Sequence, residues 1–93
     1  MIAWSLILMT QAKVWEFETN GRVESSPTVV GGRVYVGCDD HTVYCLDAAT
    51  GRKQWEFGTG GTVWSSPLVR GGRLYVGSHD GNLYALSAAT GDK

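Results

Sequence analysis

The apolar positions of this chain fall in short runs that are bounded by glycines or small polar residues. Ser26–Val30 is followed by the glycine pair 31–32 and then by Arg33–Gly37, and the same order recurs around Gly71 and Gly72. A glycine pair between two β-rich runs suits a tight hairpin turn, because both central residues need positive φ. No segment shows the 3.6-residue period of an amphipathic helix. The pattern predicts an all-β chain of hairpins.

Two further strands complete the predicted unit. A polar turn leads into residues 43–46, and the turn Ala48–Gly51 leads into a strand that begins at residues 55–57. Four antiparallel strands in a short repeat are the content of one β-propeller blade. Val34, Tyr35 and Val36 are apolar at consecutive positions, so both faces of the sheet are expected to be covered.

The pattern occurs twice, as a tandem repeat. Residues 14–53 and 54–93 align without a gap and are identical at 24 of 40 positions. A fixed period of this length indicates stacked or radially arranged units. Residues 1–13 align with the ends of the two repeats, with Trp4 on Tyr44 and Lys13 on Lys53. We interpret this segment as the degenerate tail of a preceding blade, comprising its third strand at residues 2–6 and its docking turn.

The predicted strands are out of phase with the repeats. Counted from the inside of a propeller, each repeat begins with the fourth strand of one blade and continues with strands one to three of the next. Trp15–Thr19 is then a fourth strand without a blade, and the last blade lacks its fourth strand. Propellers contain about four to eight blades. We therefore expect a closed ring, either a homo-oligomer of two, three or four copies or a longer propeller that contains this chain.

Net charge and the length of the apolar run exclude two kinds of partner. Eight basic and nine acidic residues give a net charge of −1, so no strong field would attract nucleic acid. The apolar run Ile2–Met9 is too short to span a bilayer, and no membrane insertion is expected. The run also lacks the basic start and the small-residue cleavage pattern of a secretory signal.

No metal, cofactor or catalytic residue is predicted. Cys38 and Cys45 flank a hairpin without lying opposite each other, and the second repeat has serine and alanine in their places. We interpret both as small packed residues, and a disulfide, which demands a tight geometry, is the lesser alternative. His41 and His79 occupy different repeat positions and fit turn residues better than a metal pair, because a zinc site needs three or four convergent ligands.

Residues 47–55, DAATGRKQW, resemble the tryptophan-docking motif of the PQQ-like (pyrroloquinoline-quinone-type) β-propeller repeat, as do Ser-Ser-Pro, Val-Tyr-Val-Gly and Leu-Tyr-Ala-Leu. The resemblance implies that the motif's tryptophan packs on a glycine peptide of a neighbouring blade, since a flat indole needs a surface without side chains. It also implies an extracytoplasmic or cell-envelope location. The blade-docking residues that the resemblance implies are Trp15, Trp55, Gly51, Gly91, Thr50 and Thr90.

The resemblance is compatible with two classes of function. Quinone-dependent dehydrogenases of this group use an adjacent cysteine pair, a stacking tryptophan, calcium ligands and a catalytic aspartate, which cannot be placed in this sequence. We therefore expect a non-enzymatic scaffold or protein-interaction module. The alternative is a small-molecule or quinone-binding module, or a fragment of a PQQ-dependent dehydrogenase.

Seven of the 16 differences between the two repeats lie in two connections, which in a propeller open on the same rim. These connections join the fourth strand to the next blade and the second strand to the third. Loops on a rigid scaffold commonly carry binding, although free drift in solvent explains the differences equally well. Trp64 is the strongest single candidate, because aromatic anchors dominate interface energetics. The candidate partner-binding rim consists of Arg22, Glu24, Asp39, His41, Trp64 and His79.

Overall fold

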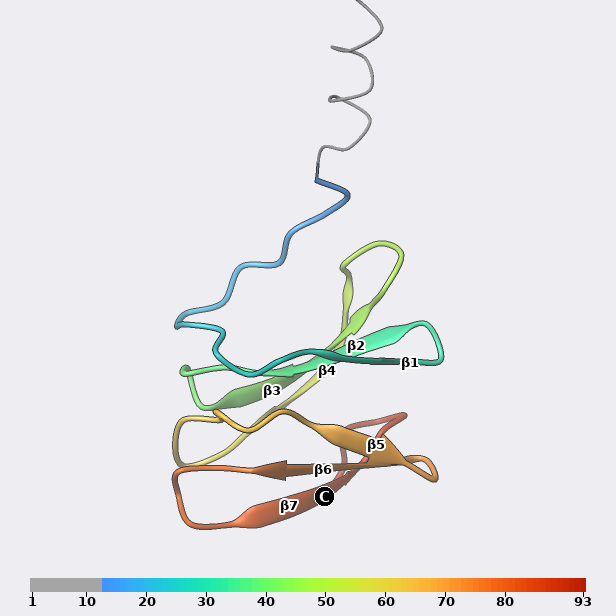
Figure 1. Ribbon diagram of the computed structural model, residues 1–93. Helices are drawn as coiled ribbons and strands as arrows, with labels where there is room; N and C mark the ends of the chain where they lie inside the picture. The colour runs from blue at the N-terminus through green and yellow to red at the C-terminus, as the bar shows by residue number, and fades with distance from the viewer. Residues whose placement is uncertain (1–12) are drawn as a thin grey trace, which may run out of the picture.

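A computed structural model describes residues 13–93, which form two antiparallel sheets packed against each other (Figure 1). The first sheet, blade 1, has the strand order β1-β2-β3-β4, and the second, blade 2, has the order β5-β6-β7. No helix occurs in this part of the chain, so the all-β blade architecture is confirmed. The strands are β1 (Thr28–Val30), β2 (Arg33–Gly37), β3 (Thr42–Asp47), β4 (Lys53–Gly58), β5 (Leu68–Arg70), β6 (Arg73–Gly77) and β7 (Leu83–Ser87).

The glycine pairs form the predicted hairpin turns. Gly31 and Gly32 have φ values of 58° and 77°, and Gly71 and Gly72 have 60° and 76°. Positive φ at both central positions matches the right-handed twist of the flanking strands. Each turn therefore fixes the register of the two strands that it joins.

Blade 1 takes its fourth strand from the second repeat. β4 pairs with β3 so that Trp55 lies opposite Cys45 and Gly58 lies opposite Thr42, with one irregularity between Cys45 and Leu46. Blade 2 contains three strands. The blades are thus displaced along the chain from the repeats, as the strand order in the sequence predicts.

One predicted strand is not formed. Residues 14–20 contain no strand, although the sequence predicts one at Trp15–Thr19. A strand requires a backbone partner, and the backbone of this segment bonds to no strand of the described residues. The strand predicted to precede it in the chain, residues 2–6, lies outside the described part.

Apolar side chains cover both faces of blade 1. One face packs against blade 2 through Tyr35, Val43 and Cys45, with Trp55 lying between the blades. The opposite face, which carries Val36, Tyr44 and Leu46, is covered by Trp15 and Phe17 rather than by another sheet.

Blade 2 is covered on one face only. Leu74, Val76 and Leu86 are buried against blade 1. On its other face, Leu83 is 77% exposed, whereas Val43, the matching residue of blade 1, is 0% exposed. The expectation that both sheet faces are covered therefore holds for blade 1 alone. None of the described residues belongs to a helix that is long and apolar enough to cross a membrane.

Candidate functional site

Trp55 of blade 1 is docked on the glycine turn of blade 2. A Cβ atom on Gly91 would lie 2.5 Å from the indole ring, so the ring rests directly on the glycine backbone. The indole Nε1 donates a hydrogen bond to the Ala88 carbonyl at 3.0 Å. Gly91 also has a φ of 79°, which other residues adopt only at a cost. This position therefore needs glycine both for its backbone conformation and for the contact.

Trp15 occupies the same position on blade 1. A Cβ on Gly51 would lie 2.6 Å from its ring, and its Nε1 donates to the Ala48 carbonyl at 2.9 Å. Phe17, two residues later, packs edge-on against Tyr44 with 5.2 Å between ring centroids. Residues 13–17 therefore contact blade 1 in the way that β4 contacts blade 2.

Thr50 and Thr90 hold the docking turns and make no hydrogen bond to the tryptophans. The Thr50 hydroxyl accepts a hydrogen bond from the Arg52 backbone N–H at 3.2 Å, and Thr90 accepts one from Asp92 at 3.3 Å. Asp47 reinforces the first turn by accepting the backbone N–H groups of Thr50 and Ala49, and these bonds lower the pKa of its carboxyl.

Two further blade contacts were missed by sequence reasoning. The Tyr35 hydroxyl donates to the Ala88 carbonyl at 3.2 Å, and the Arg33 guanidinium donates to the carbonyls of Ala88 and Ala89 at 3.3 and 3.0 Å. Ala88 is thus the acceptor for three side chains of blade 1, counting Trp55. The available signal was that arginine and tyrosine recur at residues 73 and 75 of the second repeat.

A carboxylate ties together the two loops of each rim, which is a second pair of sites that the sequence analysis overlooked. Asp80 accepts hydrogen bonds from the Tyr84 hydroxyl at 2.5 Å, from the Gly60 N–H at 2.9 Å and from the Asn82 N–H at 2.9 Å. In blade 1, Asp40 accepts matching bonds from the Tyr44 hydroxyl and from the backbone of residues 20 and 42. The identical Asp and Tyr, four residues apart in both repeats, were the signal.

The hydrogen bonds of Asp40 and Asp80 lower the pKa of both carboxyls, which favours their charged form. The Tyr84 hydrogen bond is the main cause that lowers the pKa of Asp80, to about 2. For Asp40, burial raises the pKa, but the hydrogen bonds from Tyr44 and neighbouring groups outweigh burial and lower it overall. Burial, followed by the Asp40 hydrogen bond and charge, raises the pKa of Tyr44 to about 12. A general acid needs a pKa near the working pH, and these lowered pKa values do not meet that need. The carboxylates are instead suited to holding loops through their hydrogen bonds.

The structure brings Trp64 and His79 together on the rim of blade 2. Their ring centroids are 5.7 Å apart, and Trp64 is 54% exposed. At the matching positions of blade 1, the side chains are Glu24, which is exposed, and Asp39. The rim is therefore aromatic on blade 2 and acidic on blade 1.

The other rim residues are linked through backbone atoms. The Asp39 N–H donates to the Arg22 carbonyl at 2.8 Å, and the Asp39 Oδ1 is buried without a hydrogen-bond partner in the described residues. His41 is exposed and has a φ of 74°, in the left-handed region where the second repeat has Gly81. Its carbonyl accepts the Thr59 N–H at 2.7 Å, which ties the rim of blade 1 to the connection that leads into blade 2.

The cysteines occupy separate environments. Cys45 is buried in the core between the blades, and Cys38 is buried in the core on the other face of blade 1. Residues 13–93 contain no cluster of three histidine, cysteine or acidic side chains that could hold a metal ion.

Comparison with known proteins places this geometry in a family. The model of the family described as outer membrane protein assembly factor BamB matches residues 7–93. Among solved structures, BamB from Moraxella catarrhalis is similar with a TM-score of 0.77 and 19% identity, over 89% of this chain and 26% of that chain. A europium-containing methanol dehydrogenase has a TM-score of 0.75 and 20% identity, over 90% of this chain and 19% of its own. At identities of 19% and 20%, these two similarities show a shared fold and nothing further.

A third structure is more similar in sequence. The quinohemoprotein alcohol dehydrogenase from Comamonas testosteroni is 32% identical with a TM-score of 0.69, over 77% of this chain and 12% of that chain. The chain spans about a quarter or less of each of these proteins. No protein of curated function matches it. The docked tryptophans, the two stacked blades and the family match together show that the chain belongs to the PQQ-like repeat family of the outer membrane protein assembly factor BamB.

Proposed function

We propose that the protein is a non-enzymatic β-propeller scaffold whose rim binds a protein partner. The observation that carries this proposal is the exposed pair of Trp64 and His79 on the rim of blade 2. A half-exposed tryptophan that keeps a fixed neighbour loses little side-chain entropy on binding, and tryptophan is among the residues that contribute most at interfaces.

The loops that carry the pair are held in place before any partner arrives. Asp80 connects the Gly60 backbone to the turn at residues 80–82, and the Ser78 and Thr59 hydroxyls lie 2.9 Å apart in the same loops. A preorganised surface binds more tightly because fewer groups must be ordered on association. The fixed loops thus support a binding role for the rim.

The family match supports a cell-envelope location and an assembly role, since the matching model is that of an outer membrane protein assembly factor. Within this proposal the chain self-assembles into a closed ring of two, three or four copies. The exposed face of blade 2 and the docked segment 13–17 support self-assembly, because β7 and this segment both lack a strand partner on one side among the described residues.

The rim is tested by affinity capture from a cell-envelope extract, followed by quantification of each retained protein. Trp64→Ala should reduce the retention of a specific partner at least tenfold. Val30→Ala, an exposed apolar residue beside the hairpin turn at Gly31, is the matched control and should retain the partner fully. Equal retention by both variants would remove the rim as the binding surface.

Quinone binding is the second candidate, and the 32% identity with an alcohol dehydrogenase favours it. The cysteines do not fit the adjacent pair that such enzymes use, because Cys38 and Cys45 are buried on opposite faces of blade 1. Pyrroloquinoline quinone should therefore leave the tryptophan fluorescence unchanged beyond its own optical absorption. Saturable quenching that Trp64→Ala abolishes would support the quinone-binding alternative instead.

A further inference from the structure

β7 is an edge strand that pairs only with β6 among the described residues, and this edge is where a second copy of the chain could join. We propose that residues 13–18 of a second copy add to β7 as the fourth strand of blade 2, with Glu18 opposite Asn82, Phe17 opposite Leu83 and Glu16 opposite Tyr84. This register is the β3–β4 register shifted by one repeat. The inference rests on the proposed self-assembly and specifies the surfaces that it uses.

Residues 13–25 lie on blade 1 as residues 53–65 lie on blade 2. The tryptophan contacts match, and the Phe17–Tyr44 distance of 5.2 Å corresponds to 5.3 Å between Phe57 and Tyr84. The later part of the segment matches too: the hydroxyl groups of Ser25 and Ser65 accept the backbone N–H groups of Gly37 and Gly77 at 2.8 and 2.9 Å. The N-terminal segment is therefore already held against blade 1 in the position that β4, the fourth strand of the preceding blade, takes against blade 2.

The two segments differ in one respect. The backbone of residues 53–58 is paired with β3, whereas residues 13–18 have no strand partner in the described part of the chain. β7 likewise pairs with β6 on one side only. Unpaired strand edges readily accept another strand, because their backbone groups lack intramolecular partners.

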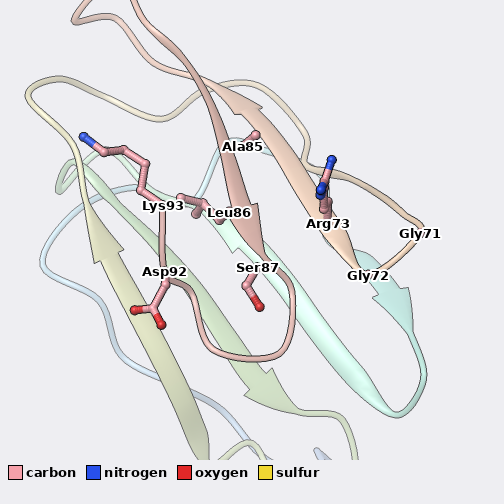
Figure 2. Close-up of a pocket in the computed structure, with 8 residues that line it drawn as sticks. All are labelled: Gly71, Gly72, Arg73, Ala85, Leu86, Ser87, Asp92 and Lys93. Carbon is pink, nitrogen blue, oxygen red and sulfur yellow. The ribbon is translucent and has the colours of Figure 1, made fainter.

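A hollow of about 450 Å³ lies beside β7, between β6 and the last residues of the chain (Figure 2). Its walls include Arg73, Ala85 and Ser87. In blade 1 the matching positions are covered, because Trp55 lies opposite Cys45 and its ring is 6.0 Å from that of Tyr35. The hollow therefore corresponds to the place that a fourth strand and its tryptophan fill.

Side-chain donors are available for the same junction. In blade 1, Arg33 and Tyr35 bind the carbonyls of the Ala88–Ala89 turn. Their counterparts Arg73 and Tyr75 make no side-chain hydrogen bond to the described residues. The Ala48 carbonyl accepts a bond from Trp15, whereas Ala88 accepts bonds from three side chains. A second copy would bring Arg73 and Tyr75 onto the turn at Ala48 and Ala49.

Exposed apolar side chains on blade 1 and blade 2 also match the surfaces that are buried between the two blades. Leu68 and Leu83 are 60% and 77% exposed on blade 2, and Val23 and Val29 are 51% and 63% exposed on blade 1. Val63 and Val69, which occupy the places of Val23 and Val29 in the second repeat, are packed in the core between the blades. The exposed residues are thus the two halves of an interface that the chain already forms once, which favours a second copy over an unrelated partner.

Cysteine pairs test the register. The double variant Glu18→Cys with Asn82→Cys should form disulfides between copies under mild oxidation, because directly opposite residues of antiparallel strands are about 4.5–5.5 Å apart. Thr42→Cys with Gly58→Cys, the equivalent pair within one chain, should give an intramolecular disulfide. Glu16→Cys with Asn82→Cys is two residues out of this register and should not cross-link. The native cysteines are fully buried and do not compete.

Sedimentation velocity of the unmodified chain separates the failure of self-assembly from the failure of this register. A monomer at all concentrations would overturn the proposed self-assembly, and this inference with it. Oligomers with no cross-link at residues 18 and 82, or with equal cross-linking at residues 16 and 82, would overturn the register alone.

The side-chain donors give an independent measurement. Arg73→Ala and Tyr75→Phe should weaken association at least tenfold and leave the unfolding of the monomer unchanged. Arg33→Ala should lower the stability of the monomer itself, since its partners lie in the same chain. Association that is unchanged in Arg73→Ala and Tyr75→Phe would contradict the placement of these residues on the Ala48 turn.

Discussion

Blades 1 and 2 have nearly the same sequence but different surroundings. Blade 1 has four strands and apolar cover on both faces, and blade 2 has three strands and cover on one face. Tyr35 is 3% exposed in blade 1, whereas its counterpart Tyr75 is only partly buried. The difference shows that a blade of this kind is completed from outside its own repeat, by a strand and a tryptophan that come from the neighbouring repeat.

We expect the largest difference in stability between the two blades at the docked tryptophans. Trp55→Ala should lower the free energy of unfolding by about 3–5 kcal/mol, because it removes a buried indole from between the blades. Trp15→Ala should cost less, since Trp15 is only partly buried on its blade. Urea unfolding of both variants measures the difference. An equal loss would mean that the two docking sites contribute alike despite the missing cover.

The glycines beneath the indoles provide a second test of how the docking contacts contribute to stability. Gly91→Ala places a Cβ 2.5 Å from the Trp55 ring, so we expect it to cost about 1–3 kcal/mol more than a turn control that shares the positive φ. Gly31→Ala is the matched control, because it also has positive φ but no atom within 4 Å of the added Cβ. Thermal unfolding of the two variants separates the contact from the backbone strain, and equal effects would argue against a packing role for Gly91.

A third difference between the blades lies in one turn. His41 has a φ of 74° where blade 2 has Gly81 with 89°. A residue with a Cβ costs about 1–2 kcal/mol in the left-handed region, and part of this is offset by the greater freedom of glycine in the unfolded chain. We expect His41→Gly to stabilise the protein by about 0.5–1 kcal/mol and Gly81→His to destabilise it by a similar amount. Changes of the same sign in calorimetry would exclude this explanation.

The smallest expected effect is on the stability of the fold at acidic pH. The folded-state pKa values of Asp40 and Asp80 lie below the ordinary carboxyl value. The stability that they contribute is therefore complete above the unfolded pKa of about 4 and is lost as the pH falls toward 2. In Asp80→Asn the decline in stability between about pH 5 and pH 2 should be shallower than in the unmodified protein. An identical slope would show that the Asp80 hydrogen bonds do not depend on its charge.

The sequence predicted those features that depend on local chemistry or on comparison between the repeats. The glycine pairs at residues 31–32 and 71–72 need positive φ, and the structure has it there. The Trp15 strand could not be predicted correctly from its composition, because a strand exists only with a partner. The hydrogen bonds of Arg33 and Tyr35 to the Ala88 turn join residues more than 50 positions apart, and no local pattern reports such a contact.

The displacement of blades from repeats has a consequence for folding cooperativity. β4 belongs to the sheet of blade 1 by its backbone and to the surface of blade 2 by Trp55 and Phe57. Neither blade can unfold without removing a strand or a side-chain cover from the other. In repeat proteins, such coupling between neighbours decides whether the units melt one by one or together. We therefore expect the six-residue strand β4 to couple the two blades, so that they unfold in one transition.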